Sequence, residues 1–256
     1  MKRRLYYSNE LIKKRRKKRK IRKFVFILLL LVAVCSILCF KLPYFNVKHI
    51  LIYNNKTITS KEIINKSGIS VNQNILLLNL SRSEINVKNI PYILSVKISR
   101  KLPDSIEIYV KERKALYYAI ADNEYLILDK YGVVLEKKSS LNDSKLIKLT
   151  GFDGKKAKIG EPIQNSTAKI NALQSISDSF EIYNDSNMQV KELDLSNIMN
   201  INVYYDNMCV KLGDSSDIDN KINSAVKILE QSANGKDSKG YIDVSCNADP
   251  VIYLQK

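Results

Sequence analysis

The stretch YILSVKISRKLPDSIEIYVKER, residues 92–113, decides the fold of the first half of this chain. On either side of the Leu-Pro-Asp-Ser step at residues 102–105, apolar residues alternate with polar or charged ones. Alternation with a period of two is typical of half-buried strands, and a Pro-Asp step between two such runs is a turn signal. The stretch therefore predicts a β-hairpin.

Two elements precede this hairpin. The segment FNVKHILIY, residues 45–53, also alternates and is rich in β-branched and aromatic residues, so it predicts a strand. The segment TSKEIINKSG then predicts a short helix, because Thr59 or Ser60 can cap it, Glu62 stands in its first turn and Gly68 can end it.

A second short helix is predicted over SRSEINVKNIP, residues 81–91, with Ser81 as its cap and Pro91 as its end. The resulting unit is β-α-α-β-β, from Phe45 to Arg113. Its predicted core consists of Ile50, Ile52, Ile63, Ile64, Leu76, Val96, Ile98, Ile106 and Ile108.

The rest of the chain alternates in many short runs, which predict strands. These runs are ALYYAI, EYLILD, GVVLEK, KLIKLTG, QVKELDLS, NINVYY, MCVKLG, GYIDVSC and PVIYLQ. Two helices are predicted among them, one near residues 165–183 and one over residues 217–232 with Asp217 as cap. The fold class is α+β, and this second domain is a mixed, mainly antiparallel sheet with two helices against it.

The N-terminus combines a basic tail with an apolar run. Residues 1–23 hold thirteen Lys or Arg and one acid, which accounts for most of the chain's net charge of +16. From Phe24 to Phe40 every residue except Ser36 is apolar, so the sequence predicts a single-span membrane anchor over residues 24–42 rather than a cleaved signal peptide. The charge asymmetry predicts a type II orientation, with the tail in the cytoplasm against anionic lipid rather than nucleic acid.

A search for chemistry yields no catalytic, cofactor or metal site. The single histidine, His49, would need to meet Cys209 for a sortase-like pair, and no phosphate-binding glycine motif occurs. The acids Asp214, Asp217 and Asp219 do not follow the spacing of a calcium loop. Cys209 and Cys246 are either separate thiols or a disulfide, and the sequence leaves both possibilities open.

Several motifs resemble the bacterial cell-division proteins of the FtsQ/DivIB family. They are the P-x-[aliphatic]-x-x-V step at residues 91–96, R-x-LP at 100–103, I-x-V-x-ER at 108–113 and D-x-x-G-V at 129–133. The resemblance covers nearly the whole chain and departs at Lys114-Ala115, where many members place a proline. It identifies the β-α-α-β-β unit with that family's POTRA domain. The expected organisation is a basic tail (1–23), a transmembrane helix (24–42), a POTRA-like domain (43–114) and a β-rich domain (115–256).

The resemblance implies a non-enzymatic scaffold of the divisome at the septal membrane. Its implied partners are FtsL-like and FtsB/DivIC-like division proteins and, through them, the septal peptidoglycan synthase; no cofactor is implied. The alternative is a membrane-anchored extracytoplasmic peptidase or hydrolase of the Ser/Lys type.

The resemblance places the partner contact on the closing strand. The expected contact residues are Tyr241, Val244, Cys246, Ile252, Tyr253 and Leu254. An uncharged, aromatic strand at a chain end fits this role, because an idle edge strand usually carries charge. Two other readings stay open: Val244, Ile252 and Leu254 belong to the core, or the POTRA-like unit makes the contact.

Overall fold

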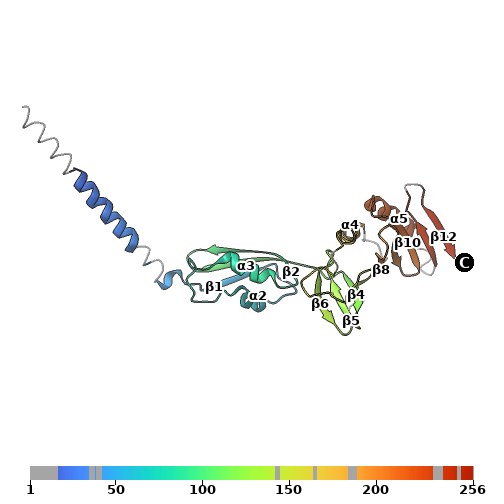
Figure 1. Ribbon diagram of the computed structural model, residues 1–256, viewed down its shortest axis with the longest axis horizontal. Helices are drawn as coiled ribbons and strands as arrows, with labels where there is room; N and C mark the ends of the chain where they lie inside the picture. Colours follow the sequence, from blue (N-terminus) through green and yellow to red (C-terminus); the bar gives the residue numbers. More distant parts are fainter. Residues whose placement is uncertain are drawn as a thin grey trace, which may run out of the picture. The chain divides into compact units, whose positions relative to one another are not determined.

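The computed structural model describes residues 17–34, 38, 42–141, 145–163, 166–183, 189–232, 239–246 and 249–255. The chain divides into two compact units (Figure 1). The first unit comprises residues up to Tyr53, 59–86 and 97–109, and the second comprises residues 54–58, 87–96 and everything from Val110 onward.

The hairpin and the elements before it form the predicted β-α-α-β-β arrangement. The elements are β1 (His49–Tyr53), α2 (Ser60–Ser67), α3 (Leu80–Lys88), β2 (Ile93–Lys101) and β3 (Ser105–Glu112). The sheet has the order β1-β3-β2, with β1 parallel to β3. The predicted order of elements is confirmed.

The helix starts follow local capping chemistry. The Glu62 backbone N–H donates to the Thr59 hydroxyl at 3.3 Å, and Gly68, with φ +69°, ends α2 in the left-handed conformation that glycine favours. The α3 helix begins one residue before the predicted cap Ser81, because the Asn79 side chain accepts the Arg82 N–H at 3.1 Å. The prediction of Ser81 as the cap is wrong.

The predicted core of the first unit is confirmed in part. Ile63, Ile98, Ile106 and Ile108 are at most 5% exposed, whereas Ile50, Ile52, Ile64, Leu76 and Val96 are only half-buried. At the connector between the helices, Ile75 rather than Leu76 is fully buried. The connector has no helical or strand period, so the sequence pattern did not decide which of these two neighbours points inward.

The prediction of a single-span membrane anchor over residues 24–42 is wrong for the described part of the chain, where no helix is long and apolar enough to cross a membrane. The described helical stretch 17–34 begins with six Lys or Arg in seven residues, and eleven apolar residues follow from Phe24. Phe40 lies outside the described residues. The type II orientation is not tested by the described residues.

The second unit is built on one mixed sheet with the strand order β12-β11-β10-β9-β8-β7-β4-β5-β6. The strands are β4 (Tyr117–Ala121), β5 (Glu124–Leu128), β6 (Val134–Lys138), β7 (Ile147–Thr150), β8 (Val190–Asp194), β9 (Ile201–Tyr205), β10 (Met208–Gly213), β11 (Lys239–Asp243) and β12 (Val251–Gln255). The strands predicted from alternation are therefore confirmed.

Two helices, α4 (Thr167–Tyr183) and α5 (Ile218–Ser232), accompany this sheet, as predicted (Figure 1). Their buried residues, including Leu173, Ile176, Ile222 and Leu229, join the inward residues of the strands in one hydrophobic cluster. This cluster contains residues of every strand from β4 to β11, including Val134 in the end strand β6, and none of β12.

Candidate functional site

The strand β12 ends the sheet and leaves one side of its backbone open. It pairs antiparallel with β11, and within the described residues no strand lies on its other side. All five residues of β12 are exposed, and four consecutive ones are large and apolar: Val251 (57% exposed), Ile252 (48%), Tyr253 (53%) and Leu254 (48%). An exposed apolar edge strand is a template for pairing with another chain.

The direction of the β12 backbone groups follows from its neighbours. In β11 and just after it, the N–H groups of Gly240 and Val244 donate toward β10, to Asn207 and Lys211. Backbone N–H and C=O groups alternate sides along a strand, so those of Tyr241 point toward β12. Tyr241 and Tyr253 are therefore a hydrogen-bonded pair. The N–H and C=O groups of Ile252 and Leu254 therefore face outward, away from the sheet.

The side chains at this edge divide between the two faces of the sheet. Ile252 lies opposite the fully buried Ile242, on the face that carries the core. On the other face, the rings of Tyr241 and Tyr253 stack with centroids 5.4 Å apart, and Lys211 Nζ lies 3.9 Å from the centre of the Tyr241 ring. A strand added beside β12 would find apolar side chains on both faces.

A glycine permits the close approach of β11 and β12. A Cβ atom at Gly240 would lie 1.9 Å from the carbonyl oxygen of Tyr253, which real atoms do not tolerate. Gly240 is therefore needed for β12 to pair with β11 in this register. Without this pairing, β12 would not form the end of the sheet.

The predicted contact residues do not all lie at the surface. Ile252, Tyr253 and Leu254 are exposed on β12, so the reading that placed Ile252 and Leu254 in the core is wrong. Val244 is 4% exposed and belongs to the hydrophobic cluster. Tyr241 is half-buried and Cys246 is exposed. Val251, which is exposed in the same apolar run, was not among the predicted contact residues.

The opposite end of the sheet has a different character. The last strand there, β6, ends in Glu136, Lys137 and Lys138. Lysine on an edge strand discourages pairing with another apolar strand. Of the two ends of this sheet, β12 is the one that is unprotected.

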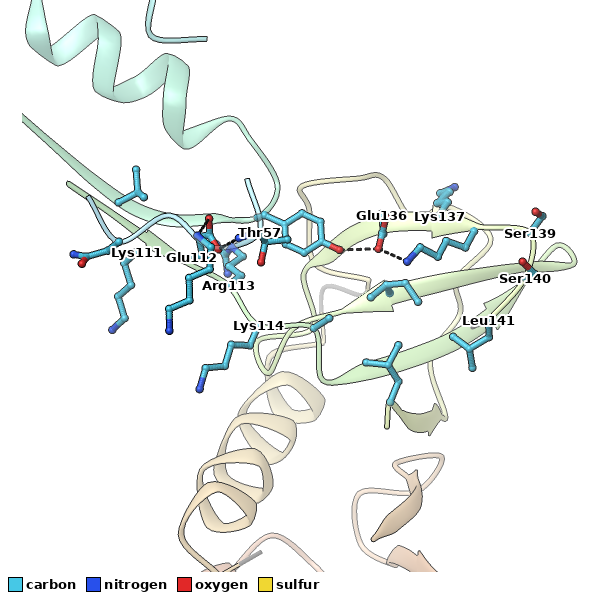
Figure 2. A pocket seen from close by; sticks show the side chains of 18 residues that line it. Thr57, Lys111, Glu112, Arg113, Lys114, Glu136, Lys137, Ser139, Ser140 and Leu141 are labelled. Atoms are coloured by element: carbon cyan, nitrogen blue, oxygen red, sulfur yellow. Dashed lines mark hydrogen bonds and ion pairs between the residues drawn. The ribbon is translucent and has the colours of Figure 1, made fainter. Parts of the chain in front are cut away.

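A cleft of about 1430 Å³ lies beside β6 (Figure 2). Within it the Tyr92 hydroxyl donates to Glu136 at 2.7 Å, and Lys138 pairs with the same carboxylate at 2.8 Å. Burial, aided by the bond to Glu136, raises the pKa of Tyr92 far above its ordinary value. Burial also acts to raise the pKa of Glu136, but Lys138 and Tyr92 outweigh it and the net pKa is lowered.

A second carboxylate in this cleft is held by backbone. Glu112 accepts the N–H groups of Lys56, Thr57 and Ile58 at 3.0, 2.8 and 3.0 Å. Burial acts to raise the pKa of Glu112, but these donors outweigh it, so the pKa lies below its ordinary value of 4.5.

The lowered pKa of Glu112 predicts an acid-dependent contribution to stability. A group whose folded pKa is lowered contributes fully above its ordinary pKa, and the contribution is lost as pH falls through the folded value. The free energy of unfolding of the wild type should therefore exceed that of Glu112→Gln at neutral pH, and the gap should narrow in acid. Denaturant titrations over this pH range measure the gap; a gap of constant size would contradict the assignment.

The structure describes the surroundings of Cys209 and Asp214, two residues considered for catalysis or metal binding. Burial raises the pKa of the Cys209 thiol, whereas the pKa of a nucleophilic cysteine is typically lowered. Cys209 and Cys246 are free thiols. Hydrogen bonds from Ser216 and the ammonium of Lys221 lower the pKa of Asp214 to about 2. The described residues contain no group of three side chains able to hold a metal ion.

The β-α-α-β-β arrangement, followed by a mixed sheet with an exposed end strand, defines a POTRA-bearing protein. Comparison with known families agrees. Residues 45–113 match the model of the POTRA domain, FtsQ-type, and residues 117–245 match that of the cell division protein FtsQ/DivIB C-terminal domain.

Relatives that align over nearly their whole length are also named as cell division proteins of this family. The chain is 38% identical to the cell division protein DivIB of Clostridium botulinum strain Hall over 259 aligned residues, which cover 100% of both chains. It is 42% identical to DivIB of Clostridium acetobutylicum over 249 residues, covering 97% of this chain and 99% of the relative. DivIB of Bacillus subtilis is 29% identical over 147 residues, 57% of this chain and 56% of the relative. The chain belongs to the FtsQ/DivIB family of cell-division proteins, which implies a role at the division septum.

Proposed function

We propose that this protein is a non-enzymatic scaffold of the divisome that holds other division proteins by strand addition to β12. The observation that carries the proposal is the exposed run Val251–Leu254 on a terminal strand with outward-facing backbone groups. The proposed partners are FtsB/DivIC-like and FtsL-like proteins, and through them the septal peptidoglycan synthase. The exposed basic stretch at residues 17–23 is proposed to contact anionic lipid headgroups.

Strand addition explains why an apolar edge is useful here. Backbone hydrogen bonds from Ile252 and Leu254 supply affinity, and alternating side chains on the two faces supply specificity. Two lysines, Lys101 and Lys130, are poor candidates for the base of a Ser/Lys hydrolase, since a lysine base needs a lowered pKa. Hydrogen bonds to Glu107 and to Asp178 instead raise the pKa values of Lys101 and Lys130.

Two variants test whether the partner binds at β12, one by changing a side chain and one by changing the backbone. Tyr253→Ala removes an exposed aromatic ring and should weaken binding of the FtsB/DivIC-like partner about tenfold, since aromatic anchors commonly contribute 1–2 kcal/mol or more. Leu254→Pro removes an outward N–H group without breaking the ladder to β11, so it should abolish strand addition while the protein stays folded. Binding is measured by surface plasmon resonance, and folding by circular dichroism.

The matched control is Tyr109→Ala. Tyr109 is 41% exposed and stacks on its cross-strand neighbour Tyr53 with centroids 4.7 Å apart, as Tyr253 does on Tyr241. It lies in the first unit and should leave binding unchanged. If the Tyr253→Ala and Leu254→Pro variants bind the partner as tightly as the wild type does, the contact lies elsewhere. A loss of binding with Tyr109→Ala alone would assign the contact to the POTRA-type domain.

A further inference from the structure

The cleft beside β6 has a strongly basic lining. Its walls come from β6 and the residues after it, the end of β3, and the segment 54–57, all of which belong to the second unit (Figure 2). Six lining residues are Lys or Arg and two are Glu. Six positive charges against two negative ones give this lining a net charge of +4.

Most of this charge is available to a ligand. Glu136 is already paired with Lys138, Arg113 is paired with the buried Asp129, and Glu112 is held by backbone N–H groups. The remaining cations are four exposed lysines, which form no ion pair within the described part of the chain: Lys56, Lys111, Lys114 and Lys137. Figure 2 shows Lys111 and Lys114 extending in the same direction.

The cleft also contains a short open backbone edge. The first residue of β6, Val134, exchanges hydrogen bonds with Glu161 and Gly160 at 3.0 and 2.7 Å, so that end of the edge is covered. In β5, the carbonyl of Leu128 accepts from Leu116 on the β4 side. Because backbone groups alternate sides, the N–H and C=O groups of Ile127 point toward its partner Glu136 in β6. The N–H and C=O groups of the next residue, Lys137, therefore point outward, away from the sheet.

We propose that this cleft docks an extended acidic peptide segment of a partner protein. The backbone of the segment pairs with β6 at Lys137, and its carboxylates approach the four lysines. Charge complementarity of this kind raises the association rate and selects the partner. The lysines that discourage apolar strands at β6 thus favour an acidic one. This surface is separate from β12 and does not depend on the partner proposed there.

Among the lining residues that the structure describes, no aromatic or arginine side chain is free to recognise a nucleic acid. Single-stranded nucleic acids need aromatic side chains on which bases can stack, and the one aromatic residue of the lining, Tyr92, is committed to Glu136. Bidentate recognition of phosphate needs arginine, and the one arginine, Arg113, is committed to Asp129.

The test uses the full chain and a fluorescein-labelled peptide in which aspartate alternates with valine, followed by fluorescence anisotropy at low salt. The double variant Lys111→Glu/Lys114→Glu should weaken binding at least about tenfold, and added salt should weaken binding to the wild type. The matched control, Lys155→Glu/Lys156→Glu, changes the net charge equally at exposed lysines outside the cleft and should bind as the wild type does.

A proline scan tests the backbone edge. Lys137→Pro should weaken binding of the peptide more than Lys137→Ala does. Both remove the lysine charge, but only proline also removes the outward N–H group. Leu254→Pro should bind the peptide normally, which separates this surface from β12. Equal losses in the cleft and control double variants would show a general charge effect and overturn the proposal. Binding of inorganic polyphosphate, but not of the peptide, to the wild type would also overturn it.

Discussion

Replacing Arg113 by Met should lower the free energy of unfolding by about 3–5 kcal/mol, the usual cost of leaving a buried charge without its partner. Asp129 is 1% exposed, and its Oδ2 lies 2.6 Å from the Arg113 guanidinium. Its Oδ1 accepts the backbone N–H groups of Tyr131 and Val133, both at 2.9 Å. Methionine retains the length of the side chain but cannot neutralise this carboxylate.

The control for this prediction separates charge from packing. Arg113→Met/Asp129→Asn removes both charges and leaves an amide oxygen to accept the two turn N–H groups, so it should be more stable than Arg113→Met alone. Arg82→Met, at an exposed arginine of α3, should change stability by less than about 0.5 kcal/mol. Urea denaturation followed by circular dichroism gives these values. If the Arg113→Met variant is as stable as Arg82→Met, the ion pair between Arg113 and Asp129 contributes nothing to the free energy of unfolding.

Replacing Ile106 by Ala should destabilise the first unit by about 2–5 kcal/mol, because it removes buried methyl groups and leaves a cavity. Ile106 is fully buried in β3 and lies opposite Ile50 in β1. The chain has two units, so one global melting temperature does not report on each of them. Hydrogen exchange read by mass spectrometry resolves the loss of protection in β1 and β3.

The matched control is Ile85→Ala in α3, where the isoleucine side chain is 63% exposed. The same atoms are removed there without a cavity, so the change should stay within about 0.5 kcal/mol. Faster exchange in β1 and β3 for Ile106→Ala, but not for Ile85→Ala, is the expected pattern. Equal exchange in both variants would mean that the β3 register is wrong.

From residue 45 onward, the sequence by itself was sufficient for the helices and strands and their order. Each strand is a short alternating run, and the capping of α2 by Thr59 and its end at Gly68 are interactions among near neighbours in the chain. Such local signals identify an element without reference to the rest of the fold. The apolar character of residues 251–254 was equally visible, since it depends only on composition.

Only the tertiary structure decided which of these residues work together. The R of the I-x-V-x-ER motif and the D of the D-x-x-G-V motif are separate in the sequence, and folding joins them as the ion pair between Arg113 and Asp129. The burial of Val244, the exposure of Ile252 and the outward N–H of Leu254 depend on β12 being last in the strand order. A strand's own pattern does not specify its neighbours, because pairing is set by long-range burial and hydrogen bonding across the whole sheet.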